Sequence, residues 1–100
     1  MSAFGVCSWS VAAADGPSGD GVAARVLEHV HADHPSIERA EILVREEDGR
    51  RHYLYVEEYP DRAAMEADHF TEECQAVWAA VEAVAETGAY VYRRFDALQA

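Results

Sequence analysis

The sequence contains no lysine and no asparagine, and its eight basic residues, all arginine, are outnumbered by nineteen acidic residues. The net charge of -11 argues against nucleic acid as a partner, because a protein neutralises phosphates with a basic surface. Long apolar runs are also absent, and none approaches the length of a membrane-spanning helix. We therefore expect a protein that binds neither nucleic acid nor membrane.

Cysteine is scarce as well. Cys7 and Cys74 are far apart and do not have the spacing of a metal-binding motif, so free thiols in a reducing compartment are the simplest interpretation. The first residues lack the basic region of a secretory signal. These observations predict a cytoplasmic protein. The alanine-rich composition without lysine or asparagine is typical of a GC-rich bacterial genome.

The remaining composition is that of a globular protein, with half of the residues hydrophobic and 27% charged. One hundred residues are enough for one hydrophobic core but not for two. We predict a single domain over residues 1–100.

The first third of the chain is predicted to form a strand, a loop and a helix. The strand spans residues 3–14, where bulky apolar residues recur. Residues 15–21 are rich in glycine and are predicted to be a loop, with Asp20 as the cap of the following helix. That helix must end near His34, because Pro35 disfavours helical geometry in the residue before it.

The rest of the chain predicts two strands, helical segments and a final strand. Strands over 37–46 and 51–59 flank Asp48-Gly49, a strong hairpin signal. A short helix follows Pro60, a helix capped by Thr71 ends before Gly88, and the last strand spans 89–95. This order predicts a ferredoxin-like βαββαβ fold of the α+β class, with four antiparallel strands and the helices on one face.

All five tyrosines lie in two predicted strands, where they alternate with aliphatic residues. Successive strand residues point to opposite faces of a sheet, so each strand has one tyrosine face and one aliphatic face. We expect the aliphatic face to pack on the helices. The tyrosine face is expected to stay uncovered and to form an interface between subunits or a ligand site. It would carry Tyr53, Tyr55, Tyr59, Tyr90 and Tyr92, with either Cys7 and Trp9 or their neighbours.

Two polar clusters are candidate sites. The glycine-rich loop lies between a strand and a helix, but it lacks the lysine of a phosphate-binding loop and is predicted to be mobile. His29, His31, Asp33 and His34 crowd the end of the first helix and offer ligands for zinc or copper. The spacing fixes no third ligand, so we predict solvated histidines near a helix C-terminus and no metal.

Single residues near the second helical region offer further candidates. His69 follows the third strand through a short helix, and Glu57 or Glu58 at the end of that strand can orient its imidazole as a proton carrier. A surface histidine is the alternative. Cys74 is interpreted as structural, since Glu72 and Glu73 beside it oppose a reactive thiolate.

The segment 53–70 resembles the central part of the antibiotic biosynthesis monooxygenase (ABM) family. Its members have a strand that ends in glutamate and an aromatic residue, then an alanine-rich helix and a histidine; here these are Glu57, Tyr59 and His69. Two departures are Cys74, where members often have a second histidine, and Tyr59, where many have tryptophan. The lack of asparagine disfavours the haem-degrading branch of the superfamily.

The resemblance implies a dimeric α/β barrel, in which the sheets of two subunits pack face to face and each subunit holds a pocket. It also implies oxidation of polycyclic phenols by molecular oxygen without metal or flavin, hence no cofactor, and a small aromatic ligand. The alternatives are a non-catalytic ligand-binding or stress-related barrel protein, and a metal- or haem-handling member. The predicted catalytic residues are His69, Tyr59 and Tyr55, and the predicted substrate-binding residues are Glu57, Trp9, Tyr53 and Trp78.

Overall fold

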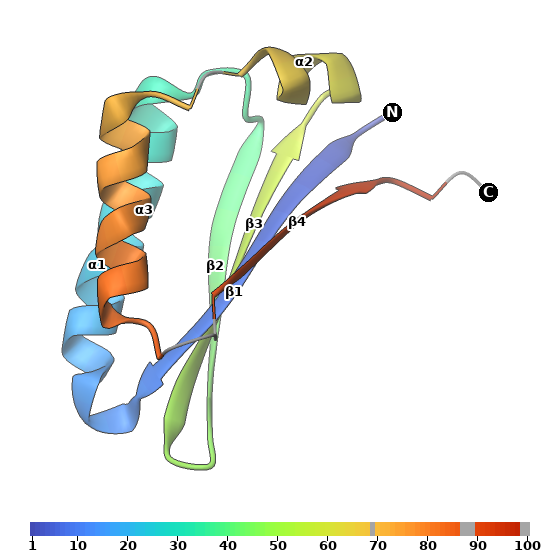
Figure 1. Ribbon diagram of the computed structural model, residues 1–100. Helices are drawn as coiled ribbons and strands as arrows, with labels where there is room; N and C mark the ends of the chain where they lie inside the picture. Colours follow the sequence, from blue (N-terminus) through green and yellow to red (C-terminus); the bar gives the residue numbers. More distant parts are fainter. Residues whose placement is uncertain (69, 87–89, 99–100) are drawn as a thin grey trace.

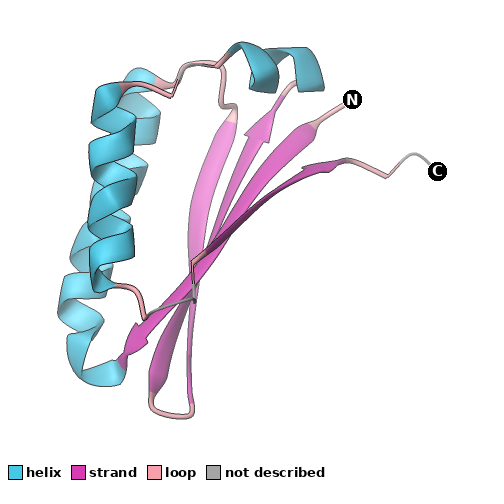
Figure 2. Ribbon diagram, viewed as in Figure 1, coloured by secondary structure: helices cyan, strands magenta, loops and turns pink. Residues whose placement is uncertain are grey.

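The computed structural model describes residues 1–68, 70–86 and 90–98, and it has the predicted order of strands and helices. The strands form one antiparallel sheet in the order β2-β3-β1-β4. Helices α1 and α3 lie side by side across one face of this sheet, and α2 lies at the end of β3 (Figures 1 and 2). The fold is therefore ferredoxin-like. The elements are β1 (Ala3–Ala12), the 3-10 turn η1 (Ala13–Asp15), α1 (Gly16–Asp33), β2 (Arg39–Glu47), β3 (Arg50–Tyr59), α2 (Arg62–Ala67), α3 (Glu72–Val84) and β4 (Val91–Asp96).

Local sequence signals set most element boundaries. Asp48 and Gly49 adopt φ values of 53° and 72°, the left-handed conformation that a tight hairpin turn between β2 and β3 requires. Thr71 Oγ1 accepts a hydrogen bond from the Cys74 backbone N–H at 3.2 Å, which caps α3 as predicted. Helix α1 ends at Asp33, directly before the His34-Pro35 pair. Helix α3 ends at Val84, before Gly88 as predicted, and Gly88 itself lies outside the described residues.

The glycine-rich segment is not a loop, and Asp20 is not a helix cap. Helix α1 begins at Gly16, and the next residue, Pro17, is tolerated because a first-turn N–H has no partner within the helix. Gly19 packs directly on the sheet, where an added Cβ would lie 2.4 Å from Tyr53 Oη. Glycine is therefore needed here for close approach of helix and strand, rather than for chain mobility.

The tyrosine face of the sheet points toward the helices, opposite to our prediction. Tyr53, Tyr55 and Tyr59 are at most 3% exposed, whereas Leu54 and Val91 on the other face are each 37% exposed. Alternation reveals that a strand has two faces but not which one the helices cover. Here the helices contribute small side chains such as Ala23, Val26, Val30 and Val81, and large rings fill the remaining space.

The main core accordingly lies between the sheet and α1 and α3. Trp9 stacks on Tyr53 with ring centroids 5.2 Å apart, and Trp78 meets Trp9 and Tyr55 edge-on. Aromatic pairs in these geometries stabilise a core beyond their burial alone. None of the helices within residues 1–68, 70–86 and 90–98 is long and apolar enough to cross a membrane.

Candidate functional site

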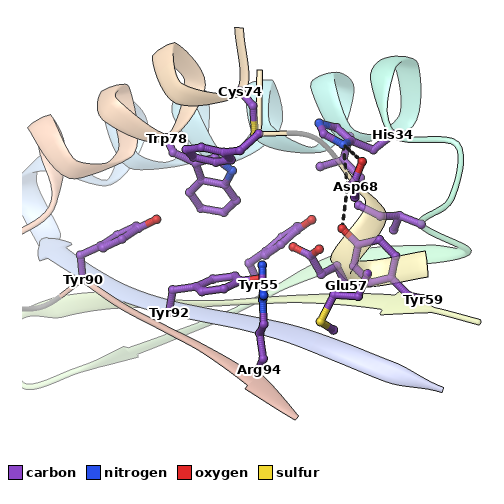
Figure 3. Close-up of a pocket in the computed structure, with 14 residues that line it drawn as sticks. His34, Tyr55, Glu57, Tyr59, Asp68, Cys74, Trp78, Tyr90, Tyr92 and Arg94 are labelled. Carbon is purple, nitrogen blue, oxygen red and sulfur yellow. Dashed lines mark hydrogen bonds and ion pairs between the residues drawn. The ribbon is translucent and has the colours of Figure 1, made fainter. Parts of the chain in front are cut away.

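A cavity of about 300 Å³ lies between the sheet and the helices, at the end where α2 leads toward α3. Its floor is formed by alternate residues of two strands, which therefore point the same way (Figure 3). Strand β1 runs between those strands and contributes no side chain at Gly5, whose register partners are Glu57 and Arg94. An added Cβ at Gly5 would lie 2.8 Å from the Glu57 side chain. The missing side chain thus opens the floor, which comprises Tyr55, Glu57, Tyr59, Tyr92 and Arg94.

The helical wall of the cavity carries the residues His34, Asp68, Cys74 and Trp78 (Figure 3). Asp68 joins this wall to the floor. It accepts a hydrogen bond of 2.6 Å from the Tyr59 hydroxyl, and its carboxylate lies 2.9 Å from His34 Nδ1. The chain from Tyr59 through Asp68 to His34 can orient a ligand and pass a proton, because each neighbouring pair is within hydrogen-bond reach.

Burial controls the charge of the floor residues. It raises the pKa of the Glu57 carboxyl, which is only 7% exposed, and this effect outweighs the opposing influence of the neighbouring Tyr59 and Tyr55 hydroxyls. Burial likewise raises the pKa of Tyr55 and of Tyr59, and for Tyr59 the hydrogen bond to Asp68 acts in the same direction. Both phenols are therefore neutral hydrogen-bond donors at neutral pH.

The Tyr55 hydroxyl has no hydrogen-bond partner within residues 1–68, 70–86 and 90–98, although the side chain is fully buried. Buried polar groups are nearly always paired, so this hydroxyl retains the capacity to donate a hydrogen bond, either to the neighbouring Glu57 carboxyl, which raises its pKa, or to a ligand atom. The Trp9 Nε1–H is unpaired in the same part of the chain, but Trp9 does not line this cavity.

The predicted site residues separate into three groups. Tyr55, Tyr59, Glu57 and Trp78 line the cavity together. Trp9 and Tyr53 do not line it; they stack on each other in the core, where the Tyr53 hydroxyl donates to Asp20 Oδ1 at 2.7 Å. His69 lies outside the described residues.

Sequence reasoning missed several cavity residues. Arg94 could have been found, because alternation along β4 places it on the same face as Tyr92. His34 was considered only as one of a solvated group, yet His29 and His34 are both buried, at 8% and 6% exposure. That prediction is wrong because α3 packs against the end of α1 and covers these rings. Asp68 carried no sequence signal, since its partners come from two other elements, Tyr59 from β3 and His34 from the end of α1.

Comparison with known proteins identifies solved structures that share this fold. No family model and no curated protein matches the sequence. A proposed antibiotic biosynthesis monooxygenase from Caulobacter crescentus is 23% identical, with a TM-score of 0.75, over 98% of this chain and 91% of that one. SnoaB, a cofactor-independent oxygenase from Streptomyces nogalater, is 21% identical, with a TM-score of 0.71, over 99% and 94%. The de novo designed protein Foldit4 is 13% identical, with a TM-score of 0.70, over 98% and 100%.

Because a designed protein shares this fold, the fold alone does not determine the chemistry, which has to be argued from the cavity. What the structural likeness establishes is architecture: the chain has the ferredoxin-like α+β fold of the antibiotic biosynthesis monooxygenases.

Proposed function

We propose that this protein is a cofactor-independent monooxygenase that oxidises a small polycyclic phenol with molecular oxygen. One oxygen atom becomes the second carbonyl of a quinone, and the other leaves as water with the phenolic hydrogen and one ring hydrogen. The substrate supplies all the electrons, so the reaction needs no reductant. The protein's task is to hold the phenol, remove its proton and keep bulk water away.

The observation that carries this proposal is the aromatic cavity with buried polar groups on its floor. Tyr55 offers an unpaired hydroxyl to a substrate oxygen, and Tyr59 is held in place by Asp68. Glu57 is buried with a raised pKa, which brings its basicity closer to that of a phenol, and we assign it as the proton acceptor on the cavity floor. Rings of Trp78 and Tyr92 provide apolar surface for a flat substrate.

The test is oxygen consumption by chelator-treated protein with a panel of polycyclic phenols. We expect one molecule of oxygen consumed per quinone formed, and a loss of about 100-fold in turnover for Glu57→Gln, within the usual range for a general base. Tyr59→Phe and His69→Ala should also slow turnover. Tyr53→Phe is the matched control, because Tyr53 is a buried tyrosine of the same strand that does not line the cavity.

A ligand-binding protein without catalysis is the second candidate, and the unpaired Tyr55 hydroxyl favours it equally. One experimental result distinguishes the ligand-binding protein from the monooxygenase. A phenol that binds with 1:1 stoichiometry in calorimetry but consumes no oxygen across the panel supports binding alone and refutes the monooxygenase.

The proposal includes a homodimer formed through the sheet face that points away from α1 and α3. That face exposes a group of large apolar side chains, 37–52% exposed, which a second copy would bury. We expect a dimer in sedimentation velocity that Leu54→Glu dissociates and Ala24→Glu, on the exposed side of α1, does not. A monomeric native protein would contradict it. The large apolar side chains exposed on this sheet face are Leu43, Leu54, Val91 and Phe95.

We also assign the protein to the cytoplasm. Cys7 and Cys74 are both free in the described part of the chain, as expected in a reducing compartment.

A further inference from the structure

Two buried histidines at the end of α1 face each other through ring nitrogens. His29 lies near the C-terminal end of the helix and His34 directly after it, and their Nε2 atoms are 3.0 Å apart. The opposite nitrogen of each ring meets a carboxylate: His29 Nδ1 lies 2.9 Å from Asp33, and His34 Nδ1 lies 2.9 Å from Asp68. Both rings are thus fixed in orientation.

This pairing determines where the ring hydrogens lie. An ionised carboxylate only accepts hydrogen bonds, so the hydrogen of each neutral imidazole is on Nδ1. The two Nε2 atoms then point lone pairs at each other at 3.0 Å, in a site where water is largely excluded. With the ring hydrogens in these positions, the arrangement favours a positive species between the rings, either a proton or a metal ion.

A third donor lies beside the pair. Cys74, in the first turn of α3 and 5% exposed, places its Sγ and a ring nitrogen of each histidine within 4.8 Å of one another. Two imidazoles and a thiolate form a donor set that suits zinc and related ions. The carboxylates of Asp33 and Asp68 hold the far nitrogens as outer partners do in histidine–metal sites.

We propose that His29, His34 and Cys74 bind a divalent transition-metal ion of the zinc class. A tetrahedral ion with metal–nitrogen distances of about 2.0–2.1 Å separates two nitrogens by roughly 3.3 Å, so the rings need to part by only a few tenths of an ångström. His34 and Cys74 also line the cavity, so the fourth coordination position faces it. This site goes beyond the proposed oxidation, which draws its electrons from the substrate and requires no metal.

The sequence pattern concealed this site. The sequence predicted one group of solvated histidines at the helix end, but only His31 is exposed, and His34 is buried directly after the end of the helix. The ligands that meet are five residues apart, and the third comes from another helix.

Cobalt substitution tests the proposal directly. Full-length protein, first treated with a chelator, is titrated with Co²⁺ and followed by absorption spectroscopy. We expect one Co²⁺ per chain, a thiolate-to-cobalt charge-transfer band in the near ultraviolet, visible bands of tetrahedral intensity, and loss of all of them on addition of Zn²⁺. Cys74→Ser should remove the charge-transfer band. His29→Gln and His34→Gln should each weaken Co²⁺ binding at least tenfold.

His31→Gln is the matched control, because this histidine lies on the same helix and is exposed. It should leave the spectrum and the affinity unchanged. If the unsubstituted protein develops no charge-transfer band with Co²⁺, the histidines share only a proton. That result would overturn the proposal whether or not any variant folds. Persistence of the band in Cys74→Ser, or equal weakening by His31→Gln, would overturn it as well. Each outcome is independent of phenol oxidation, which is measured on chelator-treated protein.

Discussion

Replacing Tyr55 by phenylalanine should make the ligand-free protein more stable and its ligand complex weaker. The Tyr55 side chain is fully buried, and its hydroxyl has no partner within residues 1–68, 70–86 and 90–98. A buried polar group without a hydrogen bond costs a folded protein about 1–3 kcal/mol. The substitution removes this cost and keeps the ring, which packs edge-on against Trp78 at 5.2 Å between centroids.

The expected net gain is about 1 kcal/mol, because the lost oxygen also leaves a small gap that forfeits packing contacts. For a chain of 100 residues this corresponds to a rise in Tm of roughly 4–8 °C. Binding should change in the opposite direction. Loss of one hydrogen bond to the ligand, worth about 0.5–1.5 kcal/mol, weakens the affinity by up to about tenfold.

Urea denaturation of ligand-free protein measures the first effect, and calorimetric titration with a bound phenol measures the second. Tyr53→Phe is the control for stability, because its hydroxyl donates to Asp20 Oδ1 at 2.7 Å and its removal should destabilise the protein by about 1 kcal/mol. If Tyr55→Phe destabilised the protein as much as Tyr53→Phe does, the Tyr55 hydroxyl would have a partner in solution and the reasoning would be refuted.

Three further predictions concern glycines and the buried carboxyl. Gly19→Ala should destabilise the protein by about 1–3 kcal/mol in thermal unfolding, because the new Cβ would collide with Tyr53. Gly21→Ala is the control in the same helix. No atom lies within 4 Å of its new Cβ, so this substitution should stabilise the protein by about 0.5–1 kcal/mol. Because burial raises the pKa of Glu57, the native state holds this proton more tightly than the unfolded state, so the native protein should lose stability relative to Glu57→Gln as pH rises from 4.5 upward. An unchanged difference across that range would contradict the assignment. Gly5→Ala places a Cβ 2.8 Å from the Glu57 side chain and should weaken phenol binding in calorimetry about tenfold, and unaltered affinity would mean that the floor does not touch the ligand.

The fold was accessible from sequence because its signals are local. The Asp48-Gly49 turn, the Thr71 cap and the His34-Pro35 helix end each depend on residues close together in the chain, and each is where the pattern placed it. The glycine-rich start of α1 was mistaken for a loop because glycine has a low intrinsic helix propensity. Its reason for being there is the contact of Gly19 with β3, which no local pattern contains.

The candidate site was accessible only in part. Tyr55, Glu57 and Tyr59 were identified because alternation along one strand puts them on one face. Their partners could not be identified in this way. Asp68 meets Tyr59 and His34 only because the end of α1 and the segment after α2 fold over the same end of the sheet.

The sequence by itself determined the order of elements and which side chains share a strand face, because these depend on composition and on short-range periodicity. Only the tertiary structure decided which strand face the helices cover, since both faces are apolar enough to be buried. It also decided that His29, His34 and Cys74 meet, because that contact joins the end of α1 to the start of α3 across the 39 residues between His34 and Cys74.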